Sequence, residues 1–109
     1  MGLMQDAADA FNADDLDRFV ACFAPDAILK DGTGTVFARG HAGVRSVYAP
    51  LMQIPGRQVH VAKEFSVGPY VVGVLTTEPA EDGGPVVVVN RVEAGRFSCS
   101  QFFAPADPL

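Results

Sequence analysis

Cysteine and histidine are scarce in this chain of 109 residues. It has two cysteines, Cys22 and Cys99, and two histidines, His41 and His60. Two cysteines far apart in the sequence do not make a disulfide framework, and both are predicted to be small buried hydrophobic residues. No cluster of His, Cys, Asp and Glu has the spacing of a zinc site. Neither a disulfide scaffold nor a metal centre is therefore expected.

Clustered positive charge and long apolar runs are also missing. The eight lysines and arginines stand singly, and the formal net charge is −5. Nucleic-acid binding needs a concentrated positive surface, so no nucleic-acid partner is expected. No run of about 18 uncharged apolar residues is present to span a membrane, and the first residues lack the regions of a signal peptide. We expect a cytoplasmic protein without a membrane partner.

What the chain does have is a composition typical of a folded domain. Hydrophobic residues make up 49% and charged residues 19% of the sequence. These proportions are those of a globular protein with a core, and not of a disordered chain. The length suits one core, and no linker or repeat divides the sequence. A single domain over residues 1–109 is predicted.

The first half of the chain carries helical signals. Apolar residues recur at helical spacing over 3–11 and again over 16–23. Asp14 is a good N-cap for the second helix, and Pro25 is expected to end it. A third helix is predicted over 40–51.

Strand signals lie between the second and third helices and throughout the second half. The predicted strands are 27–31, 35–38, 59–67, 70–78, 86–92 and 96–103. Helices followed by a meander indicate an α+β fold, a cone-shaped curved antiparallel β-sheet of about six strands wrapped by three N-terminal helices. The inside of such a cone is apolar, and cavities of this kind commonly hold small molecules.

Asp31 is the most informative single residue. It stands at the end of an otherwise apolar strand, just before the glycine turn at 32–34. A carboxylate in this place is costly unless it faces a pocket, a partner or water. One interpretation is a general base, or a carboxylate that binds a polar group of a ligand. The alternative is a turn aspartate that accepts hydrogen bonds from the amides of Thr33 or Gly34.

Four segments carry a resemblance that covers nearly the whole chain. They are FNADDLDRF at 11–19, FAPDAILKD at 23–31, RGHAGVRSVY at 39–48 and VEAGRF at 92–97. With these segments the chain resembles the nuclear-transport-factor-2-like (NTF2-like) superfamily, in its branch of SnoaL-like polyketide cyclases and ketosteroid isomerases. The resemblance implies the cone fold, a small, mostly apolar ligand and no cofactor. It is weak evidence for one function, because this fold hosts many chemistries.

Ketosteroid isomerase gives the sharpest comparison. The resemblance implies that Asp31 stands in the place of its general base and Tyr48 in the place of a tyrosine of its hydrogen-bond network. The two donors of its oxyanion hole are missing, since they fall near Ala7 and near Val87 or Val88. Without these donors much of the enolate stabilisation is lost, so ketosteroid isomerase activity is not expected. The alternative for Tyr48 is a core tyrosine with its hydroxyl at the edge.

Five further residues are candidates for contact with the ligand. They are Phe19, Phe23, His60, Ser100 and Phe102. Strand alternation places His60 opposite Val59 and Val61, so it lies on the outer face of the sheet if these valines face the cone. The last strand has two faces, one with Ser98, Ser100 and Phe102, the other with Cys99, Gln101 and Phe103. Either face is able to line the pocket.

The sequence leaves functions of different classes open. The first is a cofactor-free isomerase, cyclase, dehydratase or hydrolase in which Asp31 is the catalytic base and Tyr48 assists. The second is a non-catalytic binder of a small apolar molecule. The third, compatible with both, is a homodimer through the outer face of the sheet, because large apolar faces are rarely left bare.

Overall fold

The helices all belong to the first half of the chain, whereas the sheet gathers strands from both halves. The structure is a computed structural model that describes residues 2–78 and 85–104. Within these residues the helices are α1 (Leu3–Asn12), α2 (Leu16–Ala21) and α3 (Gly40–Met52). The strands are β1 (Phe23–Lys30), β2 (Val36–Arg39), β3 (Gln58–Val67), β4 (Tyr70–Glu78), β5 (Val86–Glu93) and β6 (Arg96–Phe103). The predicted α+β class, with three helices and six strands in these residues, is confirmed.

The strands form one sheet in the order β2-β1-β6-β5-β4-β3. From β3 to β6 each strand pairs antiparallel with the next, and β1 pairs antiparallel with β2. β1 and β6 are parallel. This follows because α3 carries the chain to the far edge of the sheet, from which three antiparallel steps bring β6 back beside β1. The sheet is therefore mixed, where the sequence predicted antiparallel pairing.

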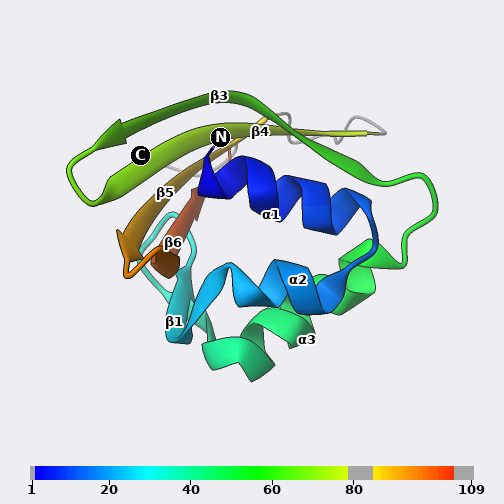
Figure 1. Cartoon of the computed structure of the whole chain (residues 1–109), viewed down its shortest axis with the longest axis horizontal. Coiled ribbons are helices and arrows are strands. Elements are labelled where there is room, and N and C mark those ends of the chain that lie inside the picture. The colour runs from blue at the N-terminus through cyan, green and yellow to red at the C-terminus, as the bar shows by residue number, and fades with distance from the viewer. Residues whose placement is uncertain (1, 79–84, 105–109) are drawn as a thin grey trace.

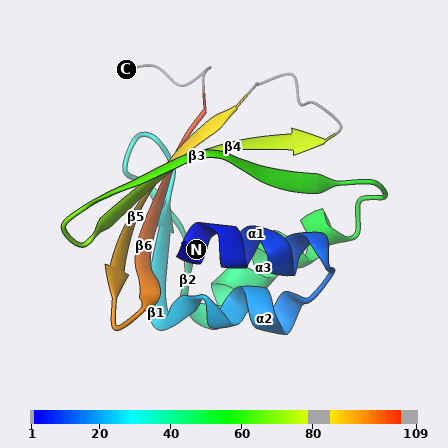
Figure 2. The ribbon, with the colours of Figure 1, turned by 45° about the horizontal axis from the view of Figure 1, so that its top comes forward.

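All three helices cover the same face of the curved sheet (Figure 1, Figure 2). α1 packs against β3, and α3 packs against β1 and β2. The buried core lies between these two layers and includes Phe11, Val20, Leu29 and Val44. The opposite face of the sheet carries no helix in the described part of the chain.

α2 is shorter than its apolar spacing predicts. Phe23 is the first residue of β1 and not the last apolar residue of the helix. Its ring still lies 5.4 Å from that of Phe19, so the apolar spacing is satisfied in either conformation and could not distinguish them. The cap is also displaced by one residue. Asp15 accepts from the Arg18 backbone N–H at 3.1 Å, while Asp14 takes a left-handed φ of 59° in the preceding turn.

Asn12 ties the end of α1 to an edge of the sheet. Its Nδ2 donates to the carbonyl of Val59 at 2.8 Å, and its Oδ1 accepts from the Val59 N–H at 2.7 Å. β3 is an edge strand, so this side-chain amide takes the place of a neighbouring strand for one residue. The pair fixes α1 against β3, and thereby one wall of the interior.

The two cysteines lie in different environments. Cys22 is buried, as predicted, and burial raises the pKa of its thiol. Cys99 is only half-buried, because strand alternation puts it on the face of β6 that no described helix covers. Both are free thiols.

The uncovered face of the sheet is largely apolar. Register places Val72 beside both Phe65 and Val89, and Val74 beside Val87. Phe65 is 59% exposed. We call the following residues the outer apolar face: Phe65, Val67, Val72, Val74, Val87, Val89 and Phe103. Lys63 and Gln101 share this face, because they pair with Val74 and Val89, and exposed apolar residues rimmed by polar ones mark an interaction site.

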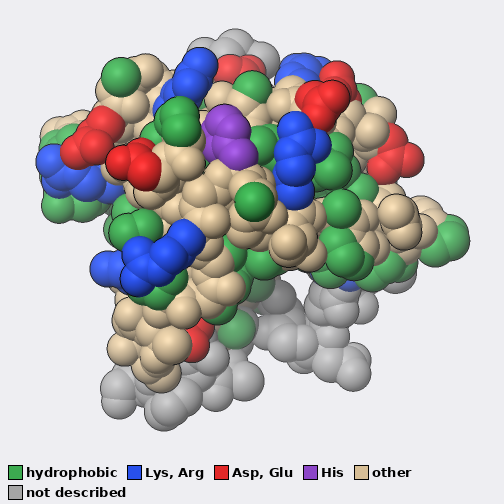
Figure 3. Space-filling view, turned by 90° about the horizontal axis from the view of Figure 1, so that it is seen from below, with side chains coloured by type: hydrophobic (Ala, Val, Ile, Leu, Met, Phe, Trp, Pro, Cys, Tyr) green, Lys and Arg blue, Asp and Glu red, His purple; other side chains and the backbone are tan. Residues whose placement is uncertain are grey.

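Charges elsewhere on the surface are mixed in sign. On the face seen from below, acidic and basic side chains are interspersed and form no patch of one sign (Figure 3). One such pair is Arg45 with Asp17, at 2.6 Å. Among the described residues, no helix combines the length and the apolar character needed to cross a bilayer.

The β5–β6 hairpin supplies a test of the backbone. Ala94 and Gly95 form its two-residue turn with φ of 52° and 76°, the geometry in which Asn-Gly is preferred. Ala94→Asn is expected to raise the free energy of unfolding by about 0.5–1 kcal/mol, since alanine is disfavoured at positive φ. Urea denaturation measures the change. Gly95→Ala is expected to lower stability, and a loss in both variants would contradict the turn assignment.

Candidate functional site

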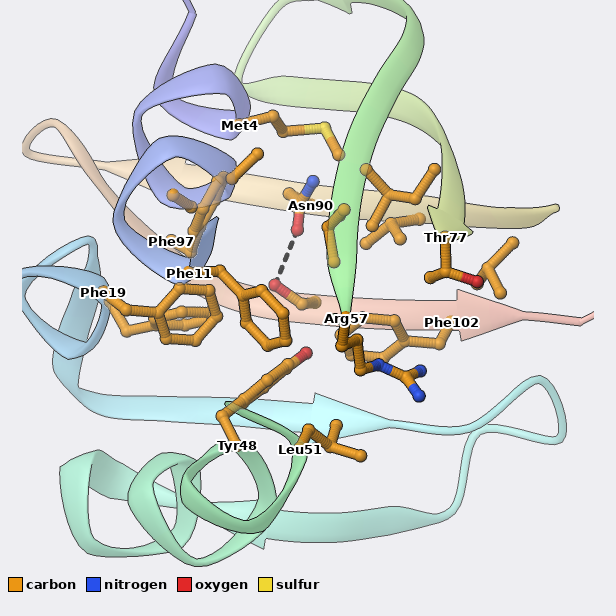
Figure 4. A pocket seen from close by; sticks show the side chains of 18 of the residues that line it. Met4, Phe11, Phe19, Tyr48, Leu51, Arg57, Thr77, Asn90, Phe97 and Phe102 are labelled. Atoms are coloured by element: carbon orange, nitrogen blue, oxygen red, sulfur yellow. Dashed lines mark hydrogen bonds between the residues drawn. The ribbon is translucent and has the colours of Figure 1, made fainter. Parts of the chain in front are cut away.

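A cavity of about 440 Å³ lies between the helices and the inner face of the sheet. Most of its lining is hydrophobic or aromatic and comes from all three helices and from strands β3 to β6. The polar residues that line it are Tyr48, Arg57, Thr77, Asn90 and Ser100. Figure 4 shows four of them, Tyr48, Arg57, Thr77 and Asn90, around the same space and on separate elements. The chain thus encloses an apolar volume with a few polar groups at fixed points.

Aromatic rings build one end of the cavity. The ring of Tyr48 on α3 lies 4.5 Å from that of Phe19 on α2, measured between centroids. Phe11 approaches both rings at 6.1 and 6.5 Å, and Phe23 links this group to Phe97 at 5.2 Å. Tilted and edge-on pairs at these distances are favourable. The cluster joins the helices to β1 and β6 and holds each ring in place.

The hydroxyl of Tyr48 points from this cluster into the cavity (Figure 4). Burial raises the pKa of Tyr48 well above its usual range, because the apolar surroundings disfavour the phenolate. The hydroxyl is therefore a neutral hydrogen-bond donor at physiological pH. It has no hydrogen-bond partner among the described residues.

Asn90 and Ser100 form a buried polar pair on neighbouring strands. They are directly paired in the β5–β6 register and are 2% and 1% exposed. The Asn90 Nδ2 donates to the carbonyl of Val71 at 3.1 Å, and the Ser100 hydroxyl donates to the Asn90 Oδ1 at 2.6 Å. The pair places an amide and a hydroxyl oxygen on an otherwise apolar wall.

Arg57 and Thr77 add polar groups at another part of the lining. Arg57 follows α3 in the connection to β3, and Thr77 stands near the end of β4. In Figure 4 the Arg57 guanidinium lies on the same side of the cavity as Phe102 and Thr77. This side therefore carries a permanent positive charge.

Five of the seven residues that the sequence nominated line this cavity. They are Phe19, Phe23, Tyr48, Ser100 and Phe102. Of the predicted face with Ser98, Ser100 and Phe102, the last two line the cavity and Ser98 does not. Phe97 lines it instead, because the β5–β6 register shifts between Arg91 and Val92. Ala7 and Val88, which resemblance placed near the missing donors, line the cavity as well.

Asp31 does not line the cavity. Its Oδ1 accepts from the backbone N–H groups of Thr33 and Thr35, at 2.9 and 3.1 Å, and from the Thr33 hydroxyl at 2.6 Å. These bonds, led by that from the Thr33 hydroxyl, lower the pKa of Asp31. The residue follows β1 where strand and turn meet, and its carboxylate folds back on the turn. The expected pocket position is corrected to a turn position, and a catalytic role for Asp31 stays a prediction.

His60 also lies outside the cavity. It pairs in register with Thr76, and its Nε2 contacts the Glu78 carboxylate in an exposed position. Val59, the preceding residue, lines the cavity. Alternation along β3 therefore turns His60 to the outer side, as the sequence allowed.

Sequence reasoning missed Arg57, Thr77 and Asn90. The sequence held a signal for Asn90, because this single amide directly follows the apolar run 86–89 and lies on the same face of the strand as Val88. Thr77 has the same parity as Leu75, which also lines the cavity. Arg57 lies in the connection between α3 and β3, where no periodicity predicts which way a side chain points.

The chemistry of the described lining is that of neutral donors and one cation. No carboxylate or imidazole is among the residues that line the cavity in the described part of the chain. No group of three or more potential metal ligands gathers anywhere within the described residues. The described lining therefore offers apolar walls, neutral hydrogen-bonding groups and one cation, and no carboxylate or imidazole as a general base.

Comparison with known proteins places this geometry in a family. The profile of the SnoaL-like domain matches residues 4–99. An uncharacterized cystatin-fold protein from Novosphingobium aromaticivorans is 28% identical, with a TM-score of 0.75 over 94% of this chain and 97% of that chain.

Two further solved structures show the same fold at lower identity. A protein from Kribbella flavida, provisionally named a ketosteroid isomerase, is 23% identical, with a TM-score of 0.74 over 98% of this chain and 78% of that chain. A protein from Sinorhizobium meliloti, provisionally named a polyketide cyclase, is 16% identical, with a TM-score of 0.74 over 92% of each chain. Because the family profile spans most of the sequence, the chain belongs to the family of SnoaL-like domains.

Proposed function

We propose that this chain binds a small, mostly apolar molecule in the cavity between its helices and its sheet. The observation that carries the proposal is an apolar volume of about 440 Å³ lined by aromatic rings and a few convergent polar groups. Its size and lining are those of small-molecule sites, in which apolar walls give affinity and polar groups fix orientation. Membership of the SnoaL-like family supports the same reading.

Blocking the cavity tests this proposal. Ala7 lines the cavity, whereas Ala42 is exposed on α3. A panel of steroids, aromatic polyketide-like compounds and terpenoids is screened by thermal shift, where a ligand at about 100 times its Kd adds about 2.7 kcal/mol of stability. Ala7→Phe is expected to abolish the shift because the ring fills part of the cavity.

The matched control for this screen is Ala42→Phe, which adds the same ring at the surface. It is expected to keep the wild-type shift. A panel in which no compound stabilises the wild-type chain would count against binding, and an equal shift in both variants would place the ligand elsewhere.

A second candidate function is cofactor-free isomerisation or cyclisation of the bound molecule. Solved neighbours provisionally named as a ketosteroid isomerase and as a polyketide cyclase favour it, and so does the neutral Tyr48 donor. Holding a flexible substrate in a reactive shape lowers the entropic part of a barrier. A donor aimed at an oxygen that gains negative charge lowers it further. In this mechanism Tyr48 donates to the reacting oxygen, and a proton-abstracting role for Asp31 is the alternative that Asp31→Asn tests.

Asp31→Asn separates a turn role from a catalytic role. The folded pKa of Asp31 is lowered, so its contribution to stability is present above its unfolded pKa of about 4 and is lost as pH falls through the folded value. We expect lower thermal stability than wild type at pH 7, and a difference that shrinks below about pH 4. Ligand binding and any turnover are expected to be unchanged.

Asp26→Asn is the matched control, because it removes an exposed carboxylate from β1 itself. It is expected to change stability less than Asp31→Asn does at pH 7. Loss of turnover in Asp31→Asn, with ligand binding intact, would restore Asp31 as the catalytic base.

The outer apolar face supports a second proposal, a homodimer through the sheet. Phe65 and Val67 are 59% and 62% exposed, and Val87 is 38% exposed. In the register Phe65 pairs with the half-buried Val72, which also pairs with Val89, whereas Val67 pairs with Tyr70 and Val87 pairs with Val74. A second copy would present the same apolar face, and a two-fold axis through the sheet makes the contact self-complementary.

Light scattering at micromolar concentration tests this assembly. The wild-type chain is expected to have the mass of a dimer, and Val89→Glu that of a monomer, because a charge at the centre of the face is costly to bury. Ala42→Glu on α3 places the same charge away from the face and is expected to remain dimeric. A monomeric wild-type chain would contradict the proposal.

A further inference from the structure

We propose that the cavity holds its ligand by a hydrogen-bond acceptor oxygen, a carbonyl or hydroxyl oxygen, placed between the Tyr48 hydroxyl and the Asn90–Ser100 pair. The inference rests on the proposed binding function and specifies the ligand's polar end. It is carried by the donors and acceptors that remain unused on these three side chains.

The orientation of the Asn90 amide follows from its neighbours. The carbonyl of Val71 is only an acceptor, so the group that approaches it at 3.1 Å must be the Nδ2 donor. The Oδ1 then faces Ser100, and the Ser100 hydroxyl gives its proton to this oxygen at 2.6 Å. The pair therefore has a defined direction.

One donor of the Asn90 amide is left over. Nδ2 carries two hydrogens, and one is used by Val71. Asn90 is 2% exposed, and its Nδ2 has no second acceptor among the described residues. A buried donor without a partner costs free energy, which an acceptor in the cavity would recover.

Tyr48 supplies a second donor from the opposite side. Its ring is held by Phe19 at 4.5 Å, and its hydroxyl points into the cavity toward the wall that carries Asn90 (Figure 4). Two neutral donors from α3 and β5 thus face a common space. In Figure 4 the Asn90 Nδ2 lies on the side of its amide toward Met4, and the Oδ1 lies on the side toward Tyr48. A ligand oxygen therefore accepts from Tyr48, the spare Asn90 hydrogen is left for a second acceptor of the ligand, and the Ser100 oxygen is free to accept from a ligand hydroxyl.

A matched pair of probes tests the inference. Fluorenone and fluorene have nearly the same shape, but only fluorenone carries a carbonyl oxygen. We expect wild type to bind fluorenone more tightly than fluorene, by about 3–10-fold, the value of one net hydrogen bond. Equilibrium dialysis below the solubility limit of each compound gives the two dissociation constants.

Tyr48→Phe removes the hydroxyl and keeps the ring. It is expected to weaken fluorenone binding by about 3–10-fold and to leave fluorene binding within about twofold. Tyr70→Phe is the matched control, since Tyr70 contacts Arg91 at the surface, and is expected to change neither constant. If Tyr48→Phe weakens both compounds equally, the residue only shapes the cavity and the inference is overturned.

The infrared carbonyl stretch of bound fluorenone is a second readout that needs no variant. In wild type it is expected at a lower frequency than in a hydrocarbon solvent, and Tyr48→Phe is expected to raise it. A hydrocarbon-like frequency in wild type, or equal affinity for the two probes, overturns the inference but leaves the binding function standing. Failure of both probes to bind overturns both.

Discussion

The contact between Tyr48 and Phe19 is the interaction on which the site depends. It joins α3 to α2 with ring centroids 4.5 Å apart, and Phe11 brings α1 to the same cluster. A tyrosine has only two side-chain torsions, so fixing the ring fixes the direction of the hydroxyl. The same packing therefore holds the helices together and aims a neutral donor into the cavity. Loss of the ring at this position would therefore remove both the packing and the donor.

The cavity exists because the helical layer does not fill the inner face of the sheet. α1 stands against the sheet through Asn12 and Val59, but it offers the small residues Ala7 and Ala8 to the interior. Ala7 lies where resemblance to ketosteroid isomerase expects a tyrosine. An alanine there leaves volume and removes a donor at once. The site consequently has more space and fewer polar groups at α1 than a tyrosine there would leave, and its polar residues lie on α3, in the connection after it, and on β4, β5 and β6.

Much of the fold follows from local pattern, whereas the site depends on long-range placement. Alternation and turn glycines predicted β4 and β6 with their observed bounds, because strand period and hairpin chemistry are local. The parallel pairing of β1 with β6 joins residues far apart in the sequence, so no local pattern predicts it. Phe23 shows what apolar spacing fails to predict, because a residue in a strand reaches the aromatic cluster as well as a residue in a helix would.

Asp31 and Asn90 are opposite errors of the sequence analysis, since Asp31 was expected at the pocket and lies in a turn, whereas Asn90 was not nominated and lines the cavity. Asp31 drew attention because a carboxylate ends an apolar strand, yet the turn itself supplies three donors to it. The carboxylate is hydrogen-bonded within its own turn because Asx turns form within a few residues and need no tertiary partner. Asn90 was overlooked because it directly follows an apolar run, although a lone amide beside valines requires partners that only the fold can provide. A polar residue with no local partner is thus the better pointer to an interior site.

The apolar walls and the polar groups of the cavity have different physical roles. Burying about 200 Å² of ligand surface is worth about 5 kcal/mol before the costs of association, whatever the ligand's shape. That term selects for size and hydrophobicity alone. A ligand without an acceptor excludes water from the Tyr48 hydroxyl and the Asn90 amide and forms no hydrogen bond in its place. The cost is about 1–3 kcal/mol for each buried group. Discrimination among apolar molecules of similar size therefore has to come from these few atoms, and their rigid placement by the aromatic cluster and the β5–β6 register is what makes it possible.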